Sequence, residues 1–380
     1  MHNTNAKILE TPYLLLDVEK LDANITRMRT QMQILGVSLR PHVKTNKSLQ
    51  VSERFFNGCK GPITVSTLHE ADYFFRAGYS DILYGVAIAP NKFHHAAQLI
   101  RAGAQLKLIL DNAQTAGELA NFAQEENLPV DILLEIDCDG HRSGLQPCSG
   151  QLIEIANQLK NGHVNIRGVM THAGDSYNAQ STEEIARCSK NEHDAVVCSA
   201  HMLKEAGFAV DIISAGSTPT ALFAKSNSGL TEVRAGVFAF FDLVMAGLGV
   251  CRVDEIALSV VTTVIGHQAT KGWTITDAGW MALSRDRGTA AQSVDQGYGM
   301  VCNMDGNPIA DLIVSSANQE HGIISSRSGS TDIPFLPIGT QLRILPNHAC
   351  ATAAQYNGYY LLNSTEDHFW PRINGWGQIS

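Results

Sequence analysis

The chain has 380 residues, 28 Lys and Arg against 37 Asp and Glu, and a formal net charge of −9. This length exceeds the size at which a single core usually stops growing, so we expect one large α/β domain with a smaller domain attached. The acidic balance and the lack of a basic block argue against nucleic acid or a membrane surface as a partner and favour a small-molecule partner.

The strongest pattern begins near residue 36, where short apolar runs alternate with segments of helical periodicity. Eight strands are predicted, at residues 37–44, 61–66, 81–87, 105–110, 130–137, 165–172, 210–216 and 230–236. Eight parallel strands joined by helices predict a closed TIM-type (β/α)8 barrel, with its site at the carboxyl ends of the strands.

After residue 250 the rhythm changes to β-like runs such as IALSVVTTVIGHQ and TQLRILPNH, separated by Gly, Asp and Asn turns. These runs predict a second, mostly β domain. The extended segment TPYLLLD near the N-terminus is expected to pair with its sheet. The predicted division is therefore 18–250 for the barrel, and 251–380 together with 1–17 for the β domain.

The cysteines and the N-terminus bear on the compartment. Eight cysteines are scattered without CxxC pairs, in a chain too large to need disulfides, which predicts reduced thiols. Neither a signal-peptide pattern nor a run of roughly 20 apolar residues is found. We therefore expect a cytoplasmic protein without a membrane anchor.

The run LRPHVKTNK, residues 39–47, places basic residues at the end of the first predicted barrel strand. Lys44 has no acidic neighbour in the run, and a desolvated lysine there is a nucleophile toward aldehydes such as pyridoxal phosphate. A surface lysine and a phosphate-binding lysine stay open as alternatives. His42 shares the strand face of Lys44 and is expected to support it, whereas Lys47 is predicted to be a solvated loop residue.

Other predicted strands also end in polar residues. His141 and Arg142 follow the fifth strand, and His172 ends the sixth. The seventh strand leads into GST, residues 216–218, and the eighth into RAGV, residues 234–237. Each alone is explained by the solvent boundary, but together they favour one site. Gly-rich turns after strands seven and eight are where barrels commonly bind phosphate.

A second pattern, PNHACAT, places His348 and Cys350 two residues apart, on one face of an extended strand if the segment is one. Imidazole and thiolate suit zinc better than magnesium. A buried histidine beside a small apolar cysteine is the alternative. The nearby SRDRG run, with Arg285 and Arg287, is interpreted as a salt-bridged turn or as a source of cations for a substrate carboxylate.

Nine motifs in this order resemble one known family: TPYLLLD, RPHVKTNKS, DGHRSG, THAGDSY, SAGSTPTAL, EVRAGVFAFFD, TDAGWMALS, NQEHG and PNHACATAAQY. The chain resembles the D-serine dehydratase and D-threonine aldolase family of pyridoxal phosphate enzymes, which shares the alanine-racemase fold, and within it the members that act on D-threo-3-hydroxyaspartate. The likeness spans nearly the whole chain.

The resemblance implies roles for the strand-end residues. Lys44 is implied to form the Schiff base with pyridoxal 5'-phosphate and to act as the general base, and His172 to pack on the pyridine ring. Arg142 matches the arginine that hydrogen-bonds the cofactor's phenolic oxygen, and Arg234 the arginine that faces the pyridine nitrogen. The remaining implied cofactor contacts are Ser217, Thr218, Gly236 and Val237 around the phosphate and a phenol hydrogen bond from Tyr177.

The same resemblance implies a divalent metal on His348 and Cys350 beside the substrate. Cysteine in the second position favours zinc, with manganese, cobalt or magnesium as alternatives, and the dehydratase side of the family. The implied reaction is dehydration of a D-3-hydroxyamino acid such as D-threo-3-hydroxyaspartate or D-serine to a 2-oxo acid and ammonia, with His321 as a tentative substrate contact.

Three interpretations stay open at this stage: the dehydratase, a metal-dependent D-threonine aldolase that releases glycine, and a non-catalytic pyridoxal phosphate binding protein. Racemisation is disfavoured by the same resemblance, because the second base of alanine racemases is a tyrosine and the corresponding region here, TDAGWMALS, has none. Relatives are homodimers, so a homodimer is expected by resemblance.

Overall fold

The computed structural model describes residues 9–160, 162–226, 228–362 and 368–377. The chain forms two compact units. The barrel unit comprises Ile25–Phe238 together with the residues from Ile373 on, and the β unit comprises the residues up to Asn24 together with Ala239–Arg372.

The barrel unit contains an eight-stranded parallel sheet in the order β2-β9-β8-β7-β6-β5-β4-β3. Its strands are β2 (Ser38–Pro41), β3 (Ile63–Val65), β4 (Asp81–Ala87), β5 (Gln105–Leu110), β6 (Val130–Ile136), β7 (Val164–Thr171), β8 (Ile212–Ala215) and β9 (Glu232–Ala235). A parallel bridge between His42 and Thr64, with the Val43 N–H 2.9 Å from the Thr64 carbonyl oxygen, joins the two outer strands. All eight predicted strands and the barrel are confirmed.

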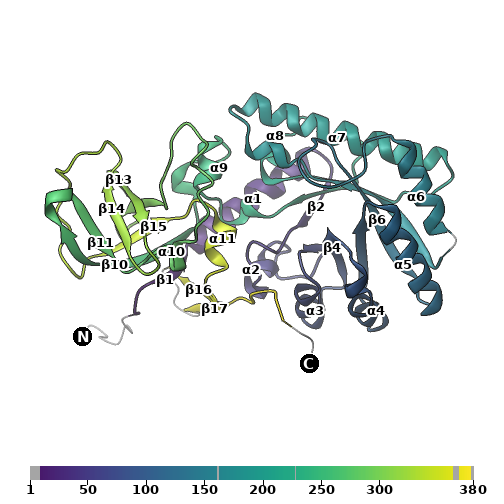
Figure 1. Cartoon of the computed structure of the whole chain (residues 1–380), viewed down its shortest axis with the longest axis horizontal. Helices are drawn as coiled ribbons and strands as arrows, with labels where there is room; N and C mark the ends of the chain where they lie inside the picture. The colour runs from purple at the N-terminus through teal and green to yellow at the C-terminus, as the bar shows by residue number, and fades with distance from the viewer. Residues whose placement is uncertain (1–8, 161, 227, 363–367, 378–380) are drawn as a thin grey trace. The chain divides into compact units, whose positions relative to one another are not determined.

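Helices cover the outside of these strands (Figure 1). They are α2 (Leu49–Arg54), α3 (Leu68–Arg76), α4 (Phe93–Arg101), α5 (Ala113–Glu125), α6 (Gly150–Lys160), α7 (Thr182–Glu205) and α8 (Thr218–Phe223), and α1 (Val18–Ile34) begins in the β unit. Several begin at a side-chain cap: Thr67, Asn112 and Ser181 each accept the N–H three residues later. One apolar cluster of the unit is formed by Leu83, Ile109, Leu133 and Met170, from four adjacent strands.

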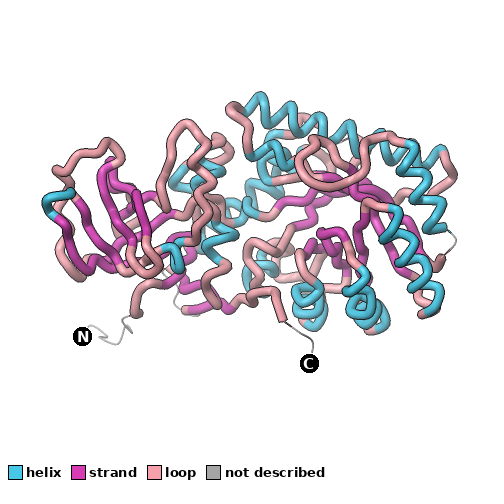
Figure 2. Tube along the Cα trace, viewed as in Figure 1, coloured by secondary structure: helices cyan, strands magenta, loops and turns pink. Residues whose placement is uncertain are grey.

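The β unit is built on a nine-stranded sheet in the order β11-β14-β13-β12-β15-β10-β1-β16-β17. Its strands are β1 (Tyr13–Leu16), β10 (Leu258–Gln268), β11 (Trp273–Thr276), β12 (Met300–Cys302), β13 (Pro308–Ala317), β14 (Gly322–Ser326), β15 (Gln341–Leu345), β16 (Gly358–Leu361) and β17 (Phe369–Pro371). Because β11 also pairs with β10, the strands from β11 to β10 close into a ring. Figure 2 shows how strands and loops dominate this unit.

The N-terminal strand β1 confirms the expectation for TPYLLLD, since it pairs antiparallel with β10 and parallel with β16. Short helices connect the strands of the β unit: α9 (Leu243–Gly247), α10 (Trp280–Leu283) and α11 (Ala349–Ala353). The division between the units follows 24/25, 238/239 and 372/373 rather than the expected 17/18 and 250/251. The described residues Ile373–Gly377 group with the barrel unit, where the Ile373 N–H donates to the Lys47 carbonyl oxygen at 3.0 Å.

Two further expectations concern cysteines and membranes. The prediction of eight reduced thiols is wrong for Cys148 and Cys198, which form a disulfide across a sequence separation of 50 residues. Helix α7 brings Cys198 beside the segment that precedes α6, with the two Cα atoms 6.1 Å apart.

Across the described residues, no helix combines the length and the apolar character that a membrane span requires.

Candidate active site

The carboxyl end of β2 presents the Lys44 turn, which we define as Val43–Lys47. The Lys44 side chain is exposed, and within the described chain its ammonium has no hydrogen bond or ion pair. His42 precedes it, with the Lys44 N–H 3.4 Å from His42 Nδ1. Burial, together with the charges of Lys44 and Arg234, holds the pKa of His42 well below its usual range, so its imidazole is neutral.

His172 follows β7 and is the second neutral imidazole of the site. Its Nδ1 lies 3.1 Å from the carbonyl oxygen of Gly216. Burial lowers the pKa of His172 to about 3, and the charges of Lys44 and Arg234 act in the same direction. Tyr177, from the 3-10 turn Gly174–Tyr177, lies with its ring centroid 6.2 Å from the His172 ring. The structure thus brings together the two residues predicted from the THAGDSY motif.

Arg234, on β9, is a buried cation, 4% exposed. Its guanidinium donates to the Ser214 hydroxyl at 2.6 Å and to the Thr171 carbonyl oxygen. Burial lowers the pKa of Arg234, whereas the nearby carboxylates oppose this shift. Those carboxylates belong to Glu232, Glu192 and Glu135. A guanidinium stays protonated in such surroundings, so a positive charge is fixed inside the barrel.

The loops after β8 and β9 carry the residues assigned to phosphate. The Ser217 hydroxyl accepts the Thr220 N–H at 3.2 Å, and the Thr218 hydroxyl accepts the Phe238 N–H at 3.1 Å. The first bond caps the N-terminus of α8, and the second joins the two loops. Within the described chain the backbone N–H groups of Thr218, Gly236 and Val237 donate to no acceptor.

Gly236 marks how closely these loops approach the Lys44 turn. A Cβ at this position would lie 2.9 Å from both the His42 carbonyl oxygen and the Thr45 hydroxyl. The glycine and the unpaired N–H groups are the features that a phosphate group requires of a protein loop. With Lys44 unpaired and a cation at Arg234, the residues present fit a phosphate-bearing aldehyde cofactor.

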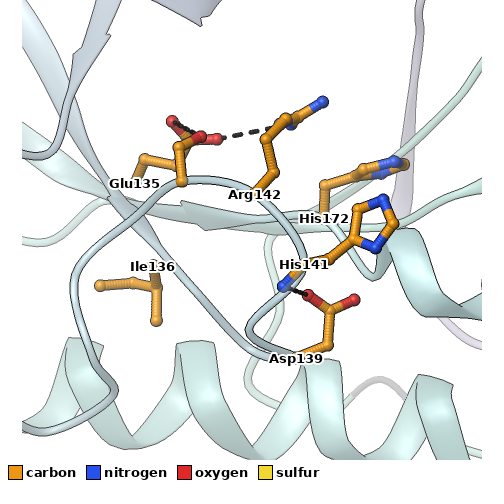
Figure 3. Close-up of a pocket in the computed structure, with 7 residues that line it drawn as sticks. Glu135, Ile136, Asp139, His141, Arg142 and His172 are labelled. Atoms are coloured by element: carbon orange, nitrogen blue, oxygen red, sulfur yellow. Dashed lines mark hydrogen bonds and ion pairs between the residues drawn. The ribbon is translucent and has the colours of Figure 1, made fainter.

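A small pocket lies beside His172 and is bordered by the loop after β6 (Figure 3). Arg142 extends from this loop toward Glu135, with 3.7 Å between its guanidinium and the carboxylate, and its side chain is 62% exposed. His141 lies next to it, and Asp139 accepts the His141 N–H at 3.1 Å. Arg142 is therefore available to a ligand rather than buried in the protein.

Sequence reasoning did not identify Glu192, a buried residue of α7. One of its carboxylate oxygens accepts the N–H groups of Ala173 and Gly216, each at 2.9 Å. The loops that carry His172 and Ser217 are thus joined by one side chain. The only available signal was an acidic residue on the apolar side of a predicted helix, which does not indicate its partners.

The predicted metal ligands lie in the β unit. His348 is the N-cap of α11 and Cys350 lies in its first turn, so the condition of an extended strand is not met. The two side chains nevertheless interact through a hydrogen bond and through charge. Burial opposes a charge on His348, but the Cys350 thiolate and the hydrogen bond to Asp286 raise the pKa of His348 to about 11.

Asp286 is the partner that sequence reasoning missed, although it lies in the SRDRG run. Its carboxylate is 2.6 Å from His348 Nδ1, which leaves Nε2 for a metal. Within the described chain, no group of three or more His, Cys, Asp or Glu side chains is placed to hold a metal ion. Two protein ligands with one imidazole oriented by a carboxylate fit an open site completed by other ligands.

Three remaining predictions have separate outcomes. The salt-bridged turn is confirmed for Arg287, which pairs with Asp295 at 2.6 Å. His321 is an exposed residue that precedes β14, and its role as a substrate contact stays a prediction. The prediction for Lys47 is wrong: it is buried, 7% exposed, and its ammonium lies 3.1 Å from Glu70.

Comparisons with known proteins identify the family. Residues 16–244 match the model of the alanine racemase N-terminal domain, and residues 257–362 match that of the putative serine dehydratase domain. The chain is 47% identical to D-threo-3-hydroxyaspartate dehydratase of Delftia sp. (strain HT23) over 97% of its length and 98% of that protein. The chain belongs to the D-serine dehydratase family with the alanine-racemase fold.

Other proteins are similar to this chain to different degrees in sequence and in structure. The D-serine dehydratase of Dictyostelium discoideum is 30% identical, over 96% of each chain. The solved structure of the Delftia dehydratase has a TM-score of 0.95 and 46% identity, and covers 97% of this chain and 99% of its own. A cysteine-to-alanine variant of that enzyme is described as its metal-free form. D-threonine aldolase from Filomicrobium marinum, at 20% identity and a TM-score of 0.81 over 97% of this chain and 96% of its own, shares the fold.

Proposed function

We propose that this protein is a lyase that uses pyridoxal 5'-phosphate and a divalent metal to convert D-3-hydroxyamino acids to 2-oxo acids and ammonia. D-threo-3-hydroxyaspartate is the substrate we favour, giving oxaloacetate. The observation that carries the proposal is the 47% identity to the Delftia dehydratase over almost the whole chain. Identity to the D-serine dehydratase of Dictyostelium discoideum is 30%, and to the D-threonine aldolase of Arthrobacter sp. it is 27%.

Lys44 is the residue we assign to proton transfer. When bound, pyridoxal phosphate supplies an electron sink that acidifies the substrate Cα–H, and the metal supplies a Lewis acid at the β-hydroxyl. Lys44 then receives the Cα proton at its Nζ, and its lack of an ion pair within the described chain leaves that atom available. A single base acts from one face, so one enantiomer of the substrate reacts.

The neighbouring residues set the charge around Lys44. The neutral imidazoles of His42 and His172 add no positive charge near Nζ, and we assign His172 to packing against the cofactor ring. Arg234 supplies a fixed cation, which we assign to the pyridine nitrogen of the cofactor. Arg142 has a mostly exposed side chain, which suits a contact with the cofactor's phenolic oxygen.

For the phosphate we assign the backbone N–H groups of Thr218, Gly236 and Val237, which have no acceptor within the described chain, together with the hydroxyls of Ser217 and Thr218, which accept a backbone N–H and can still donate. Tyr177 is assigned to a further phenol contact. Short backbone donors hold a phosphate dianion without a lysine or arginine.

For the metal we assign His348 and Cys350 as ligands and zinc as the ion, since imidazole and thiolate are its usual donors. Asp286 orients His348 from its other ring nitrogen. Manganese, cobalt and magnesium are the alternatives. We also propose, from the family resemblance, a homodimer in the cytoplasm and a substrate contact from His321.

Product identity tests the proposal. The purified chain, supplied with pyridoxal phosphate and zinc, is incubated with D-threo-3-hydroxyaspartate, D-serine and D-threonine in turn. We expect oxaloacetate and ammonia from the first, less pyruvate from the second, and no activity in Lys44→Ala. Glycine as the main product would overturn dehydration in favour of the aldolase, and no product from any substrate would favour a non-catalytic binding protein.

The aldolase stays as the second candidate for a specific reason. The chain is 27% identical to 3-hydroxy-D-aspartate aldolase of Paracoccus denitrificans (strain Pd 1222) over 96% of its length, and that protein's name includes the same substrate type. Assaying glycine and glyoxylate beside oxaloacetate from 3-hydroxyaspartate separates the two reactions in one experiment.

A further inference from the structure

We propose that Lys47 and the C-terminal segment, defined as Ile373–Gly377, hold the Lys44 turn in its working position. Lys47 is thus a positioning residue for Lys44 rather than a catalytic residue. The inference rests on the proposed function, because the position of the turn matters for catalysis only if Lys44 is the reactive lysine.

The first observation is that Lys47 is anchored by its ammonium. Its side chain is 9% exposed, and Nζ donates to the Asn374 carbonyl oxygen at 2.7 Å and lies 3.1 Å from the Glu70 carboxylate. Glu70 is itself fully buried and its other oxygen accepts the Ser66 N–H at 2.8 Å. A buried ammonium needs such partners, since an unpaired charge in the interior is strongly unfavourable.

The second observation is that the C-terminal segment contacts both the backbone and the side chain of Lys47. The Ile373 N–H donates to the Lys47 carbonyl oxygen at 3.0 Å, and the Trp376 ring centroid lies 5.0 Å from Nζ. The Thr67 hydroxyl donates to the Gly375 carbonyl oxygen at 2.7 Å and fixes the segment to the start of α3. Both the backbone and the side chain of Lys47 are therefore tied to this segment.

Gly375 shows how close that contact is. Its φ is +85°, and a Cβ would lie 2.6 Å from Lys47 Nζ and 2.8 Å from Glu70 Oε1. Only a residue without a side chain allows the backbone of the segment to reach the ammonium in this conformation. The contact between the C-terminal segment and Lys47 therefore depends on the glycine at position 375.

The Lys44 turn depends on these anchors because it has left the sheet. β2 ends at Pro41, and the turn is attached at its start through the Val43 N–H to Thr64 at 2.9 Å. At its end, Lys47 adopts a φ of +48°, a conformation that costs a non-glycine residue about 1 kcal/mol or more unless its surroundings enforce it. With Lys44 itself exposed, the anchors at Val43 and Lys47 hold the two ends of the turn that carries it.

Lys60 provides a matched control elsewhere in the barrel unit. It also pairs with a glutamate, Glu53, and its ammonium also lies 5.0 Å from an aromatic ring, that of Tyr79. It has no contact with the Lys44 turn among the described interactions. Lys60→Met therefore removes the same kinds of contact without touching the proposed anchor.

The experiment compares wild type, Lys47→Met, Lys60→Met and a chain that ends at Arg372. Hydrogen exchange of the peptide containing residues 43–48 is measured in the cofactor-free protein, and the dissociation constant for pyridoxal phosphate by absorbance. Losing a hydrogen bond to a charged group typically costs about 1.5–3 kcal/mol. We expect roughly tenfold or greater increases in exchange rate and in dissociation constant for Lys47→Met and the shortened chain, and no change for Lys60→Met.

The outcomes separate this inference from the proposed function. If Lys47→Met does not fold, the shortened chain, which keeps Lys47 and loses only a terminal segment, gives the same test. Unchanged exchange in the turn, or faster exchange with unchanged cofactor affinity, overturns the positioning role while wild-type activity leaves the function standing. A wild-type chain that binds no pyridoxal phosphate overturns the function itself.

Discussion

The imidazole Nδ1 of His172 donates a hydrogen bond to the carbonyl oxygen of Gly216, 3.1 Å away. The donor must be the imidazole because a carbonyl oxygen only accepts. In the neutral ring the proton is thus fixed on Nδ1, and Nε2 carries the lone pair. The N–H of Gly216 is in turn held by Glu192, which also holds Ala173, so one buried carboxylate stabilises the loops on both sides of His172.

We predict that Glu192→Ala destabilises the cofactor-free protein by about 2–6 kcal/mol, because two buried N–H groups lose their acceptor at about 1–3 kcal/mol each. Glu192→Gln keeps an oxygen of the same shape and is expected to cost about 1 kcal/mol. Urea unfolding followed by circular dichroism measures both. Glu205→Gln, at an exposed position of the same helix, is the control; if Glu192→Ala unfolds at the same urea concentration as that control, the carboxylate has no joining role.

The low pKa of His172 predicts a pH dependence of stability. Burial lowers the pKa to about 3 in the folded chain, below the ordinary value of 6.5. The unfolded chain therefore takes up the proton first as pH falls, and this contribution is full above about pH 6.5 and is lost progressively down to about pH 3. Between pH 7 and pH 5 the cofactor-free wild type should lose about 2 kcal/mol more than His172→Phe, which has no group to titrate there. Parallel stability curves for the two proteins would contradict the neutral buried imidazole.

The barrel could be predicted because its signal is local. Buried parallel strands read as short apolar runs, and β4 (Asp81–Ala87) and β5 (Gln105–Leu110) have the bounds that those runs predicted. Lys44 and His172 could also be placed, because the carboxyl ends of parallel strands meet at the same edge of a barrel.

The features that the sequence did not predict depend on contacts between residues far apart in the chain. Lys47 looked solvated because its burial is made possible by Asn374, 327 residues later. Asp286 lies 62 residues before His348, with nothing in the run to indicate their hydrogen bond. Glu192 gave no sign of accepting two loop N–H groups. In each case the deciding contact is a tertiary one that no local pattern indicates: Lys47 and Glu192 are buried by it, whereas Asp286 stays exposed.

Removing the buried cation at Arg234 is predicted to be among the most destabilising changes in the barrel. Glu232, Glu192 and Glu135 lie near it, and without the guanidinium these buried carboxylates lose a positive charge that offsets their burial, although Glu232 keeps its pair with Arg40. Arg234→Met should cost about 3–5 kcal/mol in the free energy of unfolding, as is typical when one partner of a buried charge group is removed. Arg167→Met is the control, since its pair with Asp211 is at the surface and is expected to contribute less than about 1 kcal/mol. Equal losses in the two variants would exclude a special role for the buried charge.

Asp286 is predicted to control metal affinity through His348. The carboxylate 2.6 Å from Nδ1 fixes the proton on that nitrogen and leaves Nε2 as the ligand atom. Asp286→Asn presents an amide that no longer favours this tautomer or the basicity of the ring, and the zinc affinity should fall about 10- to 100-fold. Competition with a coloured chelator measures this affinity on the cofactor-free protein, so the result does not depend on catalysis.

Asp295→Asn is the control for this prediction, because it breaks the neighbouring ion pair with Arg287 and should leave the zinc affinity unchanged. Cys350→Ala and His348→Ala should each reduce it further than Asp286→Asn, because they remove a ligand atom rather than its support; an unchanged affinity in Asp286→Asn would show that His348 binds metal without it.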